Sequence, residues 1–422
     1  MSRRASAFAI AAMCATLFSG PAAATAQESA CDVPWRLEET LRLGSLDGDD
    51  ALSPVRALEI GPDGRIYLLQ SWDHHVSVFL PDGRPAGRVG RAGSGPGEFA
   101  SDPRRMGWRA DTLWVSDRFV TQFFLADGTP VRQVSFSVPM PAEGSRFAPG
   151  TPLADGTFLP YRTVNQESER FLLRHRAPLR RLSASGEIVD TIAMVERHLA
   201  DHVIHRERDS RGFGMMTPHP LTPDNDQSWL PVVAAADGSA VVFIGEVSPE
   251  DEQPTFDLLR IGIAGDTLLH RAVPYVPLPV TTEERELMRE QFAARIAGDL
   301  TPERLRPPWR IRDADRRRRI AREAITFPGT HPPVLRMLAG HDGSIWLLRE
   351  AWPRDASLWE VYDEEGNLEG SVQTWAASTG NPDYRPYVFQ ASRSEVWAQV
   401  RGALDVPYIV RYEVRRPCGQ EG

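Results

Sequence analysis

A short unit recurs along this chain: a turn rich in Asp and Gly followed by a strand-like run of aliphatic and aromatic residues. Six copies align on PDGRIYLLQ, RADTLWVSD, ADGTFLPYR, ADGSAVVFI, HDGSIWLLR and ASRSEVWAQ. In the first five copies a second strand and a second turn follow, as in VSVFLPDG and LWEVYDEEG. Two turns and several short strands per unit predict repeated antiparallel sheets. A β-sandwich would not give this regular recurrence, so the pattern favours an all-β, six-bladed β-propeller over residues 27–422.

The two ends of the chain predict how the ring closes. The sixth unit stops after YIVRYEV, one strand short of a blade, and WRLEETLRLG near the N-terminus is a strand without partners of its own. We expect this N-terminal strand to pair antiparallel with the last one, with the segment around Leu41 beside Val410. The pairing would also bring Cys31 and Cys418 together, and an exported protein with one such pair is expected to form the disulfide.

Two stretches carry a resemblance to a known repeat. SWDHHVSVFLPDGRPAGRVGRAGSGPGEF and SDRFVTQFFLADGTPVRQV resemble NHL-type repeats, in which an Asp and an aromatic or Val precede a Phe, an Asp-Gly turn and a Gly-rich exit ending in Glu-Phe. The long helical insertion before THPPVLRMLAGHDGSIWLLRE further resembles that of bacterial secreted six-bladed propellers. The resemblance implies a propeller fold and an export route, and it implies no activity. It also makes the glycine run 90–99 a structural loop rather than a phosphate loop, because no Lys-Ser/Thr tail follows it.

The N-terminus predicts export. Residues 1–26 have the arrangement of a signal peptide: Arg3 and Arg4, an apolar stretch, and a small-residue cleavage site at Ala24-Thr25-Ala26. Its removal takes the formal net charge from −9 to −11, because it holds two arginines and no acidic residue. That charge argues against general nucleic-acid binding, and no later apolar run is long enough to span a membrane. We expect a periplasmic or extracellular monomer. The chain has no lysine, which excludes Schiff-base chemistry.

Loop length predicts which face of the propeller binds a ligand. Connections from the first to the second strand and from the third to the fourth are tight, whereas the second-to-third and inter-blade connections are long. In a propeller the two long sets emerge at one end, here called the long-loop face, and the tight turns emerge at the other, the tight-turn face. The long loops supply these ligand-binding candidates: Trp72, His74, His75, Asp117, Arg118, Arg162, Arg349, Trp352 and Arg401.

Two functions are compatible with these residues. Several arginines around one mouth suit a peptide, a protein or an anionic glycan, since guanidinium groups pair with carboxylates. In that case the chain is a binding module without a cofactor, unless the arginines only pair with nearby acids as a solvated rim. The alternative is a lactonase-like hydrolase or lyase that uses a divalent ion, with Ca²⁺ at the axial channel near Asp117 and Glu246. That alternative rests on fold analogy.

The largest insertion, residues 277–333, lies between the fourth and fifth units. Thr281 or Thr282 is expected to cap a helix that ends at Gly298, and a second helix follows around the basic run RRRR. Acidic residues flank that run, so a solvated helix face is expected. We expect the two helices to pack over the long-loop face as a lid.

Three histidines form a weaker candidate site. His198, His202 and His205 are spaced by four and three residues and would share one face of a helix, where they could bind zinc. The pattern lacks an acidic general base, so surface or packing histidines are the default expectation.

Overall fold

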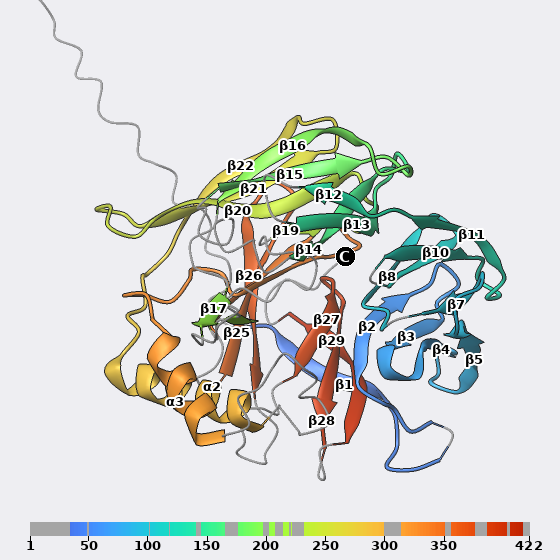
Figure 1. Cartoon of the computed structure of the whole chain (residues 1–422), viewed down its shortest axis with the longest axis horizontal. Helices are drawn as coiled ribbons and strands as arrows, with labels where there is room; N and C mark the ends of the chain where they lie inside the picture. Colours follow the sequence, from blue (N-terminus) through green and yellow to red (C-terminus); the bar gives the residue numbers. More distant parts are fainter. Residues whose placement is uncertain are drawn as a thin grey trace, which may run out of the picture.

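The computed structural model describes most of the chain between residues 34 and 416. The described residues are 34–48, 50–100, 102–117, 119–140, 145–164, 176–196, 202–206, 214–218, 221, 232–298, 314–350, 356–375, 386–402 and 406–416. Within them, six sheets of four or five antiparallel strands form the six blades of a β-propeller (Figure 1). This confirms the predicted fold class and the order of the units.

The first three blades follow one another along the chain. Blade 1 consists of β2 (Val55–Ile60), β3 (Ile66–Gln70), β4 (His75–Phe79) and β5 (Pro85–Val89). Blade 2 consists of β8 (Arg105–Arg109), β9 (Thr112–Ser116), β10 (Val120–Phe124) and β11 (Pro130–Ser135). Blade 3 consists of β13 (Ser145–Pro152), β14 (Phe158–Val164), β15 (Arg176–Leu182) and β16 (Ile188–Glu196), with β12 (Val138–Met140) added on β13.

The other three blades complete the ring. Blade 4 consists of β19 (Val232–Ala234), β20 (Ala240–Ser248), β21 (Thr255–Gly262) and β22 (Thr267–Pro274). Blade 5 consists of β23 (Arg336–Ala339), β24 (Ile345–Glu350), β25 (Ala356–Tyr362) and β26 (Leu368–Trp375). Blade 6 consists of β27 (Tyr387–Ala391), β28 (Glu395–Arg401), β29 (Pro407–Arg415) and β1 (Arg36–Leu43).

Short elements lie between the blades. The 3₁₀ helix η1 (Ser71–Asp73) joins β3 to β4, and β6 (Arg91–Ala92) pairs parallel with β7 (Glu98–Phe99). That pair encloses the glycine run, which is fixed by an ion pair of 2.8 Å between Arg91 and Glu98. The run is therefore a structural loop, as predicted.

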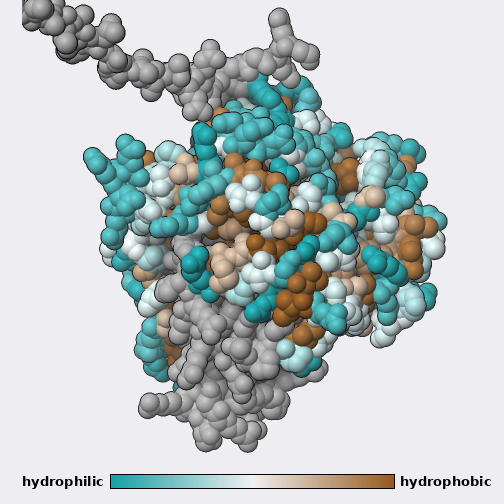
Figure 2. Space-filling view, turned by 90° about the horizontal axis from the view of Figure 1, so that it is seen from above, coloured by the Kyte–Doolittle hydropathy of each residue, from teal (hydrophilic) through white to brown (hydrophobic). Residues whose placement is uncertain are grey.

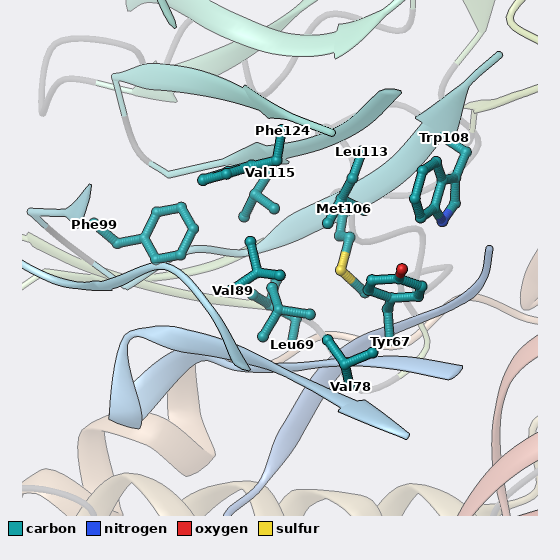
Figure 3. Packing of buried hydrophobic residues seen from close by; sticks show 11 residues of the cluster. Tyr67, Leu69, Val78, Val89, Phe99, Met106, Trp108, Leu113, Val115 and Phe124 are labelled. Atoms are coloured by element: carbon teal, nitrogen blue, oxygen red, sulfur yellow. The ribbon is translucent and has the colours of Figure 1, made fainter. Parts of the chain in front are cut away.

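The core of the molecule lies between the blades. Six of the apolar clusters each join two successive blades, and one of them joins blade 6 to blade 1. Between blades 1 and 2, Tyr67 lies edge-to-face on Trp108 at 5.1 Å, and Phe99 on Phe124 at 6.0 Å (Figure 3). Burial of apolar side chains at every interface around the ring is the main source of stability for such repeats.

Strand β1 closes the ring as the sequence predicted. It pairs antiparallel with β29, so that Leu41 lies opposite Arg411 and Arg42 opposite Val410. The ladder ends where Arg36 lies opposite Arg415, a few residues from Cys31 and Cys418. Both cysteines lie outside the described residues, so the disulfide stays a prediction.

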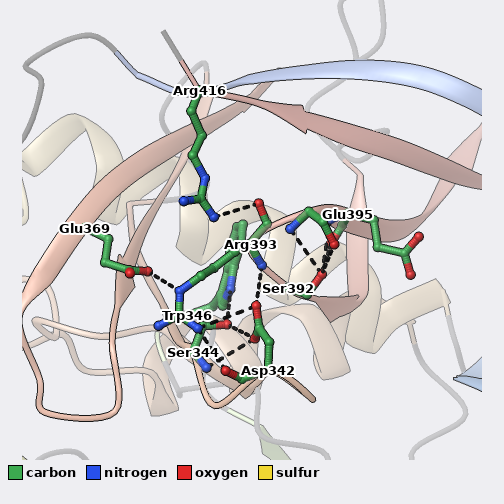
Figure 4. Close-up of polar contacts among 9 residues, drawn as sticks. Asp342, Ser344, Trp346, Glu369, Ser392, Arg393, Glu395 and Arg416 are labelled. Carbon is green, nitrogen blue, oxygen red and sulfur yellow. Dashed lines mark hydrogen bonds and ion pairs between the residues drawn. The ribbon is translucent and has the colours of Figure 1, made fainter. Parts of the chain in front are cut away.

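A polar clasp on the tight-turn face ties blade 5 to blade 6 (Figure 4). The Arg393 backbone N–H donates to Asp342 at 2.7 Å, and its Nε donates to Glu369 at 2.6 Å. Arg416 in turn donates to the Arg393 carbonyl at 3.1 Å. The clasp joins the chain's last described residue to the turns of two blades, next to the closing strand.

The insertion is helical, with α2 (Thr282–Gly298) and α3 (Ala314–Ala324). Thr281 Oγ1 accepts from the Glu284 N–H while Glu284 Oε2 accepts from the Thr281 N–H, which is the predicted capping arrangement. The two helices share a buried apolar cluster and lie beside one another at one side of the molecule (Figure 1). Arg318 pairs with Glu290 of α2 at 2.5 Å, consistent with a solvated, ion-paired face for the basic run.

The surface is mostly hydrophilic with small apolar patches. Figure 2 shows such patches between hydrophilic side chains on the face seen from above. Outer strand β16 contributes the exposed Ile188, Val189 and Met194. In the described part of the chain, no helix has the length and apolar character needed to cross a membrane. The predicted signal peptide, residues 1–26, lies outside the described residues.

Candidate functional site

The inner strands of the blades surround an axial cavity of about 170 Å³. Strands β2, β8, β19, β23 and β27 line it, together with Thr151 of β13. A wider cup of about 640 Å³ lies at the tight-turn end, and the two share Trp108, Arg109, His341 and Gln390. Each inner strand runs from the long-loop face to the tight-turn face. Residues at the starts of these strands therefore lie at the long-loop end of the cavity.

The long-loop end of the cavity is cationic. Arg56 on β2, Arg104 just before β8 and Arg336 on β23 all line it. Arg56 and Arg104 are exposed, whereas Arg336 is only 9% exposed and stacks on the Tyr387 ring at 3.9 Å. No described residue forms an ion pair with any of the three guanidinium groups. Their charge is therefore balanced only by solvent or by a ligand.

The tight-turn end contains a linked set of charged groups. Arg109 is held rigidly, with Nε donating to the Pro152 carbonyl at 2.8 Å and Nη1 to the Ala236 carbonyl at 2.7 Å. Burial lowers the pKa of Arg109, and the Glu59 carboxylate opposes this. His341 Nε2 lies 3.6 Å from Glu59 Oε2, and that carboxylate raises the pKa of the imidazole against the opposing effect of burial. Among the described residues, Glu59 is the only carboxylate that lines the axial cavity.

Unpaired polar atoms also border the cavity. Gln390 Oε1 is buried and has no hydrogen-bond partner, and the same holds for Nε1 of Trp108 and Trp114. Buried polar atoms without partners are uncommon because each costs about 1–3 kcal/mol. In the channel, therefore, one acceptor and two donors of the fold remain without a partner among the described residues.

Of the predicted residues, Trp72, His74 and His75 lie on the turn that joins β3 to β4. Trp72 is 68% exposed. The histidines instead support the turn: His74 Nδ1 contacts the Phe99 carbonyl at 3.1 Å, and His75 contacts the Asp73 carbonyl and Ser77 Oγ at 3.1 Å. Their ring nitrogens are therefore partly engaged, and Trp72 and Asp73 are the side chains that the turn exposes to solvent.

Asp117 and Arg349 also have structural partners. Asp117 is buried and accepts from the Phe119 and Val120 N–H groups at 3.0 Å, which shapes the turn before β10. Arg349 donates to the Pro333 carbonyl at 2.6 Å, pairs with Glu360 and lies over the Phe256 ring at 4.9 Å. No hydrogen bond or ion pair joins either of them to the Trp72 turn.

The remaining candidates are less fully described. The backbone of Arg162 lies in β14, and Arg401 ends β28 at the long-loop face. Arg118 and Trp352 lie outside the described residues. Of the candidates whose side chains the structure describes, none is among the residues that line the axial cavity, and neither is Glu246. No described side chain of α2 or α3 is among the lining residues either. Packing of the helices over the long-loop face as a lid stays a prediction.

Two of the three histidines of the triplet lie on a strand rather than on a helix. His202 and His205 belong to β17 (His202–Arg206), which pairs with β18 (Gly214–Pro218), so the helical spacing argument is wrong for them. His198 lies outside the described residues. Among the described residues, no group of three or more His, Cys, Asp or Glu side chains could hold a metal ion. Metal binding by the triplet stays a prediction.

Sequence reasoning missed the arginines of the channel. A signal for them was present, because Arg56 and Arg336 stand within the first two residues of the inner strands VRALEI and RMLA, and Arg104 directly precedes the inner strand RMGWR. Binding residues usually lie on loops, and these strand positions were therefore not among the predicted candidates.

Comparisons with known proteins give a fold-level likeness only. No family model and no curated protein matches the chain. Among solved structures, a Bacteroides fragilis protein described as exported is 10% identical, with a TM-score of 0.46, over 92% of this chain and 98% of that one. Virginiamycin B lyase from Staphylococcus aureus is 11% identical, with a TM-score of 0.38, over 90% and 99%. Regucalcin from Agrobacterium tumefaciens is 11% identical, with a TM-score of 0.36, over 89% and 95%. At these scores the likeness carries no argument about activity, and the six-bladed propeller rests on the strand pairing described above.

Proposed function

We propose that the chain is an exported binding module that takes the anionic group of its ligand at the long-loop end of the axial channel. The observation that carries this proposal is the set of three guanidinium groups, Arg56, Arg104 and Arg336, that line one cavity without an acidic partner among the described residues. The formal net charge of the whole chain is −9, so a local concentration of positive charge is unexpected from composition. Arginine forks pair well with carboxylates and phosphates.

The geometry of the site supports selectivity for small groups. A cavity of about 170 Å³ admits a single functional group or one sugar-sized unit rather than a folded segment. Arg336 is largely desolvated, and charge-assisted hydrogen bonds are stronger in such surroundings than in water. Export and the NHL-like character of the repeats belong to the same proposal and rest on the sequence of residues 1–26 and of the first two units.

The calcium-dependent alternative has less support from these residues. A calcium ion takes six to eight oxygen ligands, several of them carboxylates. Among the described residues, the axial cavity offers one carboxylate, Glu59, with Arg109 beside it, and Asp117 is engaged in its own turn. We therefore assign the channel no ion, and we expect the melting temperature to stay unchanged when a chelator is added.

The proposal is tested by calorimetric titration of the mature protein with galacturonate, phosphate and sulfate. We expect at least one anion to bind, with an affinity that falls as salt is raised. Arg56→Gln should weaken binding about tenfold, since it removes one charge-assisted contact. Arg88→Gln is the matched control, because Arg88 is exposed on outer strand β5, far from the channel. Equal binding by wild-type and Arg56→Gln proteins, or no binding of any anion, would contradict the proposal.

A further inference from the structure

An exposed tryptophan is held rigidly on the long-loop face. Trp72 lies in η1, which ends at His74 in the left-handed conformation with φ 54° and ψ 39°. Contacts of His74 with the Phe99 carbonyl and of His75 with Ser77 fix the residues on either side of the turn. An indole that is 68% exposed on a fixed turn has no packing role in the described fold. It offers a flat apolar surface to a ligand. Because the turn already holds this surface in place, little conformational entropy is lost when a ligand binds.

The turn that carries this indole is bonded to the segment that leads into the cationic end of the channel. Ser71, the residue before Trp72, donates its hydroxyl hydrogen bond to the carbonyl of Pro103, the residue before Arg104. Arg104 is anchored in turn by its backbone N–H, which donates to the Ser116 carbonyl at 2.9 Å. The turn of blade 1 and the entry to blade 2 are therefore joined directly. The exposed indole of Trp72 comes directly after Ser71, and the unpaired guanidinium group of Arg104 comes directly after Pro103.

We propose that the ligand is an acidic polysaccharide, with one sugar ring against Trp72 and its carboxylate toward Arg104. This inference rests on the proposed function and deepens it: a neighbouring acidic sugar would place its carboxylate at Arg56 and Arg336 in the channel mouth. A uronate unit combines the two chemistries that the surface offers. Its pyranose ring has an apolar face for the indole, and its carboxylate pairs with a guanidinium group.

An acidic protein fits the same surface less well. Stable protein interfaces bury about 800 Å² per partner around a desolvated apolar centre. Among the described residues of the long-loop face, the large exposed apolar side chains come from separate loops, and they include Leu46, Trp72, Phe119 and Val276. A single ring beside charged groups is better suited to a chain of sugars, which needs one flat contact per unit.

The test compares binding of polygalacturonate, free galacturonate, dextran and poly-L-glutamate to the mature protein by biolayer interferometry and calorimetry. We expect polygalacturonate to bind at least about tenfold more tightly per site than galacturonate, and dextran not to bind. Trp72→Ala should weaken polygalacturonate about tenfold and change galacturonate less than about twofold. Arg104→Gln should weaken both, and Arg88→Gln neither. Circular dichroism verifies that each variant is folded, which is expected because all three side chains are exposed.

Each other outcome has a definite meaning. If galacturonate binds in the channel but polygalacturonate binds no more tightly, or if Trp72→Ala leaves the polymer unaffected, the polysaccharide inference is overturned while the proposed anion site stands. If poly-L-glutamate binds as tightly as polygalacturonate and Trp72→Ala weakens both equally, the partner is an acidic protein and the inference is also overturned. If neither galacturonate nor either acidic polymer binds, the proposed function itself fails.

Discussion

Replacement of Trp35 by Ala tests whether the N-terminal strand holds the ring closed. Trp35 is 5% exposed and lies where the closing strand begins. Its backbone N–H donates to the Ser371 carbonyl of blade 5 at 2.7 Å. Its ring lies edge-to-face on Trp346 at 6.4 Å, and the Arg416 guanidinium lies over it at 4.6 Å. The side chain thereby joins blade 5 to the strand that completes blade 6.

The expected cost follows from the area that the ring buries. A buried tryptophan removes about 200 Å² from water, which at about 25 cal/mol per Å² is worth about 5 kcal/mol. The alanine retains part of that burial, whereas the cavity and the lost ring contacts add to the cost. We therefore expect Trp35→Ala to lower the free energy of unfolding by about 4 kcal/mol, measured by equilibrium denaturation in urea.

Glu38→Ala is the matched control for this experiment. Glu38 lies on the same strand, its side chain is 61% exposed, and it pairs with Arg415 at 2.9 Å on the surface. Such an exposed pair contributes less than about 1 kcal/mol. If Trp35→Ala lowers the free energy of unfolding by no more than Glu38→Ala does, strand β1 does not hold the ring and the reasoning is refuted.

Three further predictions concern pH, redox state and backbone strain. Because Glu59 raises the pKa of His341, their pairing stabilises the folded state fully below about pH 6.5 and ceases to do so as the pH rises through the raised value. The melting temperature should therefore fall more on Glu59→Gln substitution near pH 6 than near pH 9, and equal losses would contradict this. The predicted disulfide closes a loop of almost the whole chain, so reduction should destabilise the mature protein by about 4–5 kcal/mol, and two free thiols before reduction would exclude the bridge. Gly90→Ala should cost about 3 kcal/mol, because φ is +77° and the new Cβ would lie 2.2 Å from a buried phenyl carbon. Gly156→Ala, with φ +82° and open space around it, should cost only about 1 kcal/mol, and similar losses for the two would refute the role of packing.

The architecture was predictable from the sequence because its signals are local and repeated. Turns such as Asp63-Gly64 require a positive φ that glycine adopts easily, and the strands between them are short and apolar. The closing strand was predictable from the number of strands, because the sixth unit is one strand short of a blade and the N-terminal strand belongs to no unit of its own. Helix α2 was predictable from its capping residues, Thr281 and Glu284.

The site was harder to predict because it depends on the meeting of distant strands. Arg56 and Arg336 are 280 positions apart, and only ring closure brings them to one cavity. Trp72 was predicted as a candidate, and the structure shows that its ring is exposed while the adjacent histidines support its turn. Arg349 was an equally good candidate from the sequence, but in the structure its guanidinium group pairs with Glu360 and lies over the Phe256 ring. Sequence alone does not say whether a given charge finds a partner within the fold.

Pairing between the first and last strands has a consequence for biosynthesis. Thr40 and Arg411, which share a hydrogen bond, are 371 positions apart, so β1 has no partner until almost the entire chain has been made. Contacts of such long sequence separation form late because the intervening chain must first be ordered. A nascent or truncated product therefore carries an open edge on its last blade together with an unattached N-terminal ribbon, and both can pair with other chains.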